Sequence, residues 1–232
     1  MVPVNQTLHD QWIRHAVMLE RLKTSEIRAI VKLLDKQVTP AIIAKADKIA
    51  TRWGTMGYSK LSIARRRSAL LKQLRGMDKM IAGGTQILHA RLKGRLTDLA
   101  KSEAAWAAMI LQRQIPLKLN YSLPAPHLLQ SIVTTRPMHG KQLREWTKAV
   151  GANTAKKVRQ AIMIGVAQGE GVGPIVQRIR GTAANGFKDG VMQTARHEAA
   201  MVTRTAIAHV SSHAREALFA EHKEVIEKVR WM

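Results

Sequence analysis

The chain has 232 residues, 46% of them hydrophobic, which is enough to bury a sizeable core in one large domain or two smaller ones. It contains no cysteine, which excludes a disulfide framework or a thiolate metal site and favours a reducing compartment. Lysine and arginine total 38 against 16 acidic residues, so the formal net charge is +22. We therefore expect a polyanionic partner, nucleic acid first, then an acidic protein surface or an anionic membrane.

Aromatic residues make up only 4% of the chain, so aliphatic residues and methionine must fill the core. This composition favours helices over sheets, because alanine and straight-chain residues lose little rotamer freedom in a helix. The first thirty residues lack the basic-then-apolar layout of a secretion signal. No apolar run approaches the roughly 20 residues needed to cross a bilayer, so no membrane-spanning segment is expected, and a membrane is left out of the predicted partners.

Amphipathic helical spacing begins with residues 7–36. Thr24 and Ser25 offer capping hydroxyls there, so we expect one helix to end and the next to begin at this point. Pro40 is predicted to open another helix that runs through Ile49, because proline is tolerated in a first turn. The stretch 53–57, with two glycines, then breaks the pattern.

Residues 60–95 are strongly basic, and Asp78 is their only acid. The apolar spacing predicts a cationic helix, a break at Gly83 and Gly84, and a second helix. A solvated helix face and a polyanion-facing stripe both remain open, and the scarcity of acids favours the stripe. The candidate DNA or phosphate contacts are Arg65, Arg66, Arg67, Lys72, Arg75, Arg91, Lys93 and Arg95.

After a helical stretch at 96–115, four prolines punctuate the chain between residues 116 and 137. We place a proline-rich linker or elbow at 116–139, between a basic N-terminal helical region (1–115) and a C-terminal helical module (140–232). Extended segments at 117–121 and 132–135 allow one small β-hairpin or a crossing of the surface. The predicted fold class is therefore mainly α.

The C-terminal module is predicted to hold helices around 143–150, 154–166, 175–179 and 191–222, with a turn-rich loop at 185–190 and a final short strand. Gly169, Gly171 and Gly173 do not form a phosphate loop, since Pro174 and Ile175 replace the required lysine and hydroxyl residue. They fit a helix C-cap and a turn, with Pro174 starting the next helix.

The last helix gathers histidines and serines without a recognisable catalytic or metal pattern. His209 and His213 share a face, but Val210 stands where a zinc protease has its glutamate, and no third ligand is evident. Ser211 and Ser212 lack a nucleophile elbow. We therefore expect no catalytic residue, no metal and no cofactor.

The same helix has two distinct faces by spacing. One is made of mostly small residues expected to be buried: Ala199, Val202, Ala206, Val210, Ala214 and Leu218. Arg204, Ala208, Ser211 and Arg215 fall on another stripe, which reaches outward or across an interface. Its arginines have two open partners, the acids of a neighbouring helix or phosphate.

Several blocks of the C-terminal half occur in an order and spacing typical of one family: Ile164–Glu170, Ile175–Thr182, Arg204-Thr205 with Ala214-Arg215, and Val229–Trp231. Together they resemble the phage head morphogenesis family, the minor head proteins of Mu-like tailed bacteriophages. "LHDQWIRHAVMLERL", "LLDKQV" and "GKQLREW" fit the family more loosely. Relatives commonly continue past the tryptophan with a Thr-Leu-Asp segment and a cysteine-containing loop, whose functions do not carry over to this chain.

The resemblance implies a structural, non-enzymatic protein of the virion, assembled in the host cytoplasm and bound to the phage portal protein at the portal vertex inside the capsid. It also implies a role in head assembly, DNA packaging or ejection, contact with other capsid or scaffold components, and non-specific contact with double-stranded DNA. Homo-oligomerisation on the portal ring stays open. The candidate protein-interface residues are Arg204, Thr205, Ser211, Arg215 and Trp231.

Two other functions remain as alternatives. A nucleoid-type DNA-binding protein without a capsid role would share the positive charge. A virion-carried metal-dependent or cell-wall-degrading enzyme would need a site that the sequence does not reveal.

Overall fold

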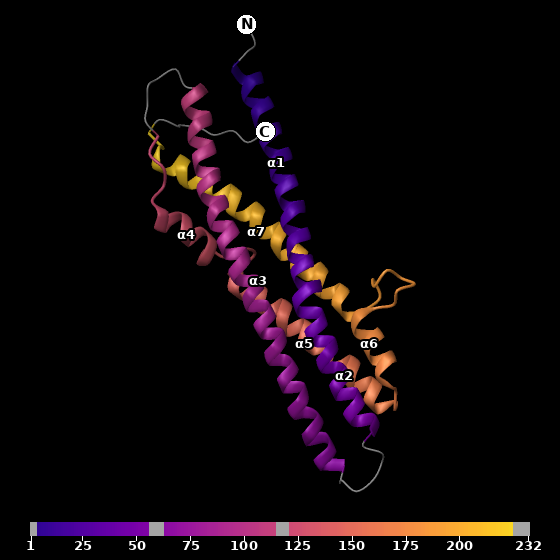
Figure 1. The fold of residues 1–232 in the computed structure, drawn as a ribbon. Coiled ribbons are helices and arrows are strands. Elements are labelled where there is room, and N and C mark those ends of the chain that lie inside the picture. The colour runs from indigo at the N-terminus through magenta and orange to yellow at the C-terminus, as the bar shows by residue number, and fades with distance from the viewer. Residues whose placement is uncertain (1–3, 56–62, 115–120, 225–232) are drawn as a thin grey trace. The chain divides into compact units, whose positions relative to one another are not determined.

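The computed structural model describes residues 4–55, 63–114 and 121–224, without the side chains of 4–7, 53–55, 63–67 and 114. These residues confirm a mainly α-helical protein and contain no β-strand, only an isolated bridge between Met138 and Lys141 (Figure 1). None of the helices, as far as they are described, combines the length and apolarity of a bilayer span. The elements in order are α1 (Val4–Leu33), the π-helix η1 (Leu34–Val38), α2 (Thr39–Thr55), α3 (Ile63–Gln114), α4 (Pro126–Thr134), α5 (Leu143–Ala167), α6 (Val172–Arg180) and α7 (Val191–Glu221).

The chain divides into two compact units that interleave along the sequence. Unit 1 consists of residues 1–27, 90–144 and 203–232, and unit 2 consists of residues 28–89 and 145–202. Helices α1, α3 and α7 therefore each contribute a part to both units. The linker predicted at 116–139 lies within a stretch of unit 1, and the three sequential regions remain a prediction.

The core of unit 1 comes from one face of each of its helices. It includes Leu19 of α1, Leu96 of α3, Ile132 of α4 and Leu218 of α7, all buried. Near the end of α3, Ala107 and Ala108 leave room for Leu218, and Trp106, Leu111, Tyr121 and Phe219 pack around this cluster. Small residues on α3 thus let the last turns of α7 approach closely.

The core of unit 2 is made mainly of aliphatic side chains that are almost fully buried. Ile42 of α2, Leu74 of α3, Ile162 of α5 and Ile175 of α6 are at most 1% exposed. The helices α2 and α6 pack directly against each other. Fully burying one such side chain stabilises the fold by roughly 1.5–3 kcal/mol, so this core holds α2 and α3 in a fixed place within the unit.

The N-terminal helix does not end where the sequence predicts. Thr24 and Ser25 lie inside α1, and their hydroxyls donate to the carbonyls of Glu20 and Leu22 instead of capping a new helix. Pro40 does lie in the first turn of α2, as predicted, although α2 continues to Thr55. The π-helix just before it, with Thr39 N–H bonded to the Leu34 carbonyl, gives the proline ring space.

The break predicted at Gly83 and Gly84 is also wrong, because α3 continues through both. A Cβ on Gly84 would lie 2.8 Å from a methyl carbon of Val38, whereas one on Gly83 would meet nothing within 4 Å. The absence of a side chain at Gly84 therefore lets α3 approach η1 closely within unit 2. That contact offsets the roughly 1 kcal/mol that glycine costs in a helix interior relative to alanine.

The extended segment predicted at 132–135 is replaced by helix α4, which runs to Thr134. Pro126 occupies its first turn, where the missing N–H is not needed, and Leu129, Ile132 and Val133 are buried. Most of the partner segment, 117–120, and the predicted terminal strand at 225–232 lie outside the described residues.

The C-terminal helices follow the sequence prediction more closely, although 143–150 and 154–166 form one helix, α5. Gly169, at a φ of +68°, ends α5 as the predicted C-cap, and Pro174 lies in the first turn of α6. The loop at 185–190 is turn-rich. All six small or apolar residues predicted to line the inner face of α7 are at most 2% exposed.

Candidate nucleic-acid interface

Helix α2 carries three basic residues along one face. Lys45, Lys48 and Arg52 have the spacing i, i+3, i+7, which places them in a row on a helix surface. The opposite face is apolar: Ile42 and Ile49, with Ala46 between them, are buried in unit 2. Burial of that face turns the basic row toward solvent, and Lys48 and Arg52 are exposed.

Helix α3 repeats the arrangement within the same unit. Lys72, Arg75 and Lys79 again have the spacing i, i+3, i+7, and all three are exposed. Leu74, Met77 and Ile81 turn the other way and are at most 2% exposed. Among the described residues, none of these three cations forms an ion pair.

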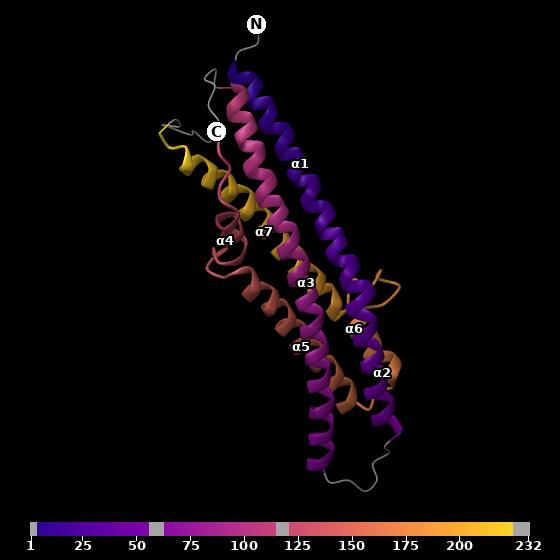
Figure 2. The ribbon, with the colours of Figure 1, turned by 60° about the vertical axis from the view of Figure 1, so that its left-hand side comes forward.

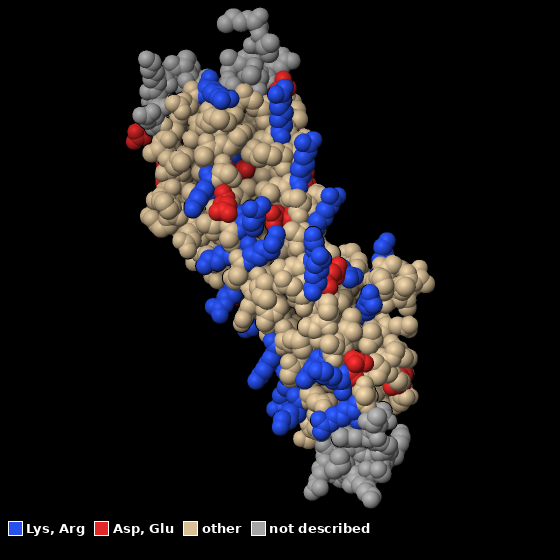
Figure 3. Space-filling model, viewed as in Figure 1, with Lys and Arg blue, Asp and Glu red and all other residues tan. Residues whose placement is uncertain are grey.

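The two rows meet where α2 runs beside α3 (Figure 2). The Cε and Nζ atoms of Lys45 lie 3.8 and 3.9 Å from the position of a Cβ on Gly76, which sits between Lys72 and Lys79 on the surface of α3. Figure 3 shows lysine and arginine side chains gathered over this part of unit 2. We call the six residues of both rows the α2–α3 basic surface.

The one acid in the basic run of α3 does not neutralise this surface. The carboxylate of Asp78 is bonded by the guanidinium of Arg159 from α5, so its charge is already compensated. Like charges held side by side repel one another, and phosphate groups would relieve that repulsion. The α2–α3 basic surface is therefore suited to contact a polyanion through charge.

The structure separates the eight predicted phosphate contacts. Lys72 and Arg75 belong to the α2–α3 basic surface in unit 2, whereas Arg91, Lys93 and Arg95 lie in unit 1. Arg95 is already bonded to the buried Glu26, its Nε donating at 2.8 Å, and this hydrogen bond raises the pKa of Arg95. The side chains of Arg65, Arg66 and Arg67 lie outside the described residues.

The sequence prediction missed the row on α2 and left Lys79 out of the candidates. The spacing of Lys45, Lys48 and Arg52 carried the signal. The segment also contains the acid Asp47 and the apolar Ile49, so it did not read as a basic run. Only the packing of α2 beside α3 shows that its basic face continues the surface of the longer run.

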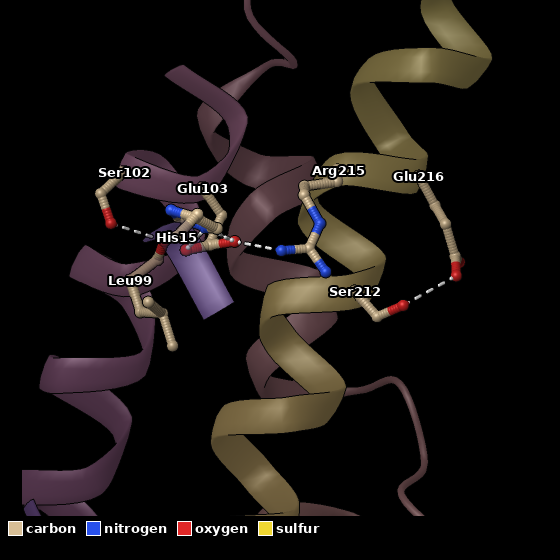
Figure 4. A network of polar contacts seen from close by, with 7 residues as sticks. All are labelled: His15, Leu99, Ser102, Glu103, Ser212, Arg215 and Glu216. Carbon is tan, nitrogen blue, oxygen red and sulfur yellow. Dashed lines mark hydrogen bonds and ion pairs between the residues drawn. The ribbon is translucent and has the colours of Figure 1, made fainter. Parts of the chain in front are cut away.

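A second cluster of charges is buried in unit 1, where Glu103 of α3 is 1% exposed (Figure 4). Its carboxylate oxygens lie 3.0 Å from Nε2 of His15 on α1, and one of them accepts a 2.7 Å hydrogen bond from Nη1 of Arg215 on α7. Arg215 is itself mostly buried. The network thus ties together three helices that are far apart in sequence.

Aromatic rings enclose this network. The His15 ring stacks on Trp106 with centroids 3.6 Å apart, and Trp106 meets Trp12 edge to face at 4.6 Å. The guanidinium carbon of Arg215 lies 5.3 Å from the Trp12 ring centroid. A charge that is buried among aromatic rings forms stronger hydrogen bonds than one in water. Removing either partner of such a pair is strongly destabilising, because the other charge is left buried and unpaired. Because both oxygens of Glu103 are occupied and inaccessible, we assign the network to stability.

The predicted protein-interface residues do not form one outward face. Arg204 is exposed and Thr205 partly exposed, but Ser211 is 2% exposed, so of its stripe's two predicted orientations it does not take the outward one. Arg215 meets an acid of a neighbouring helix, one of its two predicted partners, so it is not an external contact in this structure. Trp231 lies outside the described residues.

The two histidines predicted to share a face of α7, His209 and His213, lie close together. Their ring centroids are 4.2 Å apart, and Nδ1 of His213 lies 2.5 Å from Glu216. Burial, and then the charges of His213 and Arg136, lower the pKa of His209 to about 4. Within the described part of the chain, no group of His, Asp and Glu is placed to hold a metal ion.

The chain matches no protein-family model, no curated protein and no solved structure.

Proposed function

We propose that this protein is a minor head protein of a Mu-like tailed bacteriophage. It binds the portal protein at the vertex inside the capsid and contacts packaged double-stranded DNA, with a role in head assembly, packaging or ejection. It works by docking and charge neutralisation, without catalysis.

The observation that supports DNA contact is the α2–α3 basic surface. Ordinary solvated helix faces mix lysine with glutamate, but this surface presents six cations on two neighbouring helices. Residues 45–52 and 72–79 include two acids, Asp47 and Asp78, and Asp78 is bonded by Arg159. Such a surface binds the phosphate backbone without reading sequence. The virion context is supported by the order of the blocks Ile164–Glu170, Ile175–Thr182 and Arg204-Thr205.

Co-purification tests the portal contact. The tagged protein is mixed with portal rings, and procapsids are probed for it with an antibody. We expect it to elute with the rings and to be present in procapsids at few copies. Absence from procapsids would overturn the proposed role.

Retention on DNA tests the second contact and separates the proposal from its rival. We expect DNA binding that weakens steeply with salt. DNA binding without portal binding would identify a nucleoid-type protein instead, and portal binding without DNA binding would leave only the docking role.

A further inference from the structure

We infer that α2 and α3 act together as a two-row clamp for duplex DNA, each row contacting the phosphates of one strand. This inference rests on the proposed DNA contact and goes beyond it. It assigns each row to one strand, so it requires both strands of the duplex to be present at once.

The geometry of the rows carries the inference. Residues i to i+7 on a helix span about 10 Å at 1.5 Å per residue, and packed helices lie about 8–10 Å apart. Lys45, Lys48 and Arg52 thus form one row and Lys72, Arg75 and Lys79 a second, with Lys45 reaching across at Gly76. The surface is a pair of cation rows within one compact unit.

Duplex DNA offers two phosphate rows to match. Each nucleotide of a strand rises about 3.4 Å along the duplex axis, so a 10 Å row covers the axial rise of about three phosphates. The minor groove between the strands is about 6 Å wide, so two rows on long flexible side chains reach both of its walls. A single strand offers only one phosphate row, and half of the clamp would then lack a partner.

Among the side chains that the structure describes, residues 39–52 of α2 and 68–88 of α3 also contain no aromatic ring. Proteins that bind single strands without sequence preference interleave aromatic side chains, on which bases stack, with their cations. The described residues of both rows carry only lysine and arginine, with aliphatic neighbours behind them such as Ile49 and Leu74. The chemistry is therefore that of a backbone clamp.

Fluorescence anisotropy of the full chain tests the clamp. The probes are a labelled 24-base-pair duplex and one of its strands, titrated over a series of NaCl concentrations. One variant removes two of the three cations of the α2 row (Lys45→Gln with Lys48→Gln), and another removes two of the three of the α3 row (Lys72→Gln with Lys79→Gln). The matched control removes two cations of the same unit, Lys156→Gln with Lys188→Gln, both exposed and outside the rows.

We expect the wild-type chain to bind the duplex at least about tenfold more tightly than the single strand. Each row variant should lose about 10- to 30-fold in duplex affinity and reduce the salt slope by about 2, since each phosphate contact contributes about 0.9. The control should change affinity less than about threefold, because scattered charges act only through the general field. Lys45→Arg with Lys48→Arg should keep duplex binding, which separates lost charge from lost folding.

The outcomes distinguish the inference from the proposal beneath it. If the wild-type chain binds no DNA, the proposed DNA contact fails and the clamp with it. If duplex binding persists unchanged in the α2-row variant, or the control loses as much, only the clamp is overturned. Equal or tighter binding of the single strand also overturns it.

Discussion

The two units use their charges in opposite ways. In unit 1, Glu103 is buried and its carboxylate is shared between His15 and Arg215. In unit 2, Lys72, Arg75 and Lys79 stand exposed in a row beside those of α2. Basic residues therefore have two different roles in this protein. A buried arginine joins helices through an acid, whereas an exposed row remains available to an external polyanion.

The largest expected effect lies in the buried network of unit 1. Glu103→Leu leaves Arg215 charged, mostly buried and without its acid, so the free energy of unfolding should fall by about 3–5 kcal/mol. Urea denaturation followed by circular dichroism measures this. The double variant with Arg215→Met should recover much of the loss, because an apolar pair of similar size needs no compensation.

The matched control is Glu20→Gln, whose side chain is 68% exposed and pairs with Lys23, three residues along the same helix. Its unfolding free energy should change by less than about 1 kcal/mol. Equal losses for Glu103→Leu and Glu20→Gln would mean that burial does not distinguish the two kinds of charge.

The next largest effect is expected where α3 crosses η1 in unit 2. Gly84→Ala places a Cβ 2.8 Å from Val38 and should lower the unfolding free energy by about 1–3 kcal/mol through overpacking. Gly83→Ala meets nothing within 4 Å and should instead raise it by up to about 1 kcal/mol through helix propensity. Thermal unfolding of the two variants checks this opposite sign, and equal shifts would remove the close-contact explanation.

A smaller effect concerns the pH dependence of unit 1. The pKa of His209 is lowered to about 4 by its burial and by neighbouring positive charge, so the unfolded chain binds its proton more readily. Stability should therefore fall as the pH drops from about 6.5 toward 4. His209→Gln should flatten this slope, while the exposed His197→Gln should not. Urea midpoints at several pH values test it, and identical slopes for wild type and His209→Gln would contradict it.

The smallest effect is expected for a surface pair of unit 2. Arg178 bonds Glu170 across the turn between α5 and α6, but its side chain is 39% exposed. Arg178→Gln should lower the unfolding free energy by less than about 1 kcal/mol, and less at high salt. Chemical denaturation at two salt concentrations measures this. A loss as large as that of Glu103→Leu would mean that this exposed pair stabilises the fold as strongly as the buried cluster of unit 1, against the account.

Local patterns in the sequence predicted part of this fold well. The spacing of Ala199, Val202 and Val210 identified the buried face of α7, because a helix repeats every 3.6 residues wherever it lies. The prediction at Gly84 was wrong. A glycine destabilises an isolated helix, but within a fold it can allow close contact with a residue distant in sequence, such as Val38. The prediction of an extended segment at 132–135 was wrong, because Ile132 and Val133 became part of the buried face of a short helix.

The candidate sites show the same limit. Arg215 has its partner 112 residues away at Glu103, and no local spacing indicates which of its two expected partners it takes. Ser211 was predicted on a stripe that reaches outward or across an interface, yet its side chain is 2% exposed. The row on α2 was readable from spacing alone, but its meeting with Lys72 and Lys79 depends on tertiary packing at Gly76.

A cryo-electron microscopy reconstruction of the phage vertex tests the central claim most directly. The account predicts copies of this chain on the portal inside the head, with α2 and α3 of unit 2 facing packaged DNA. An empty portal surface, or copies whose α2–α3 basic surface faces away from the DNA, would contradict it.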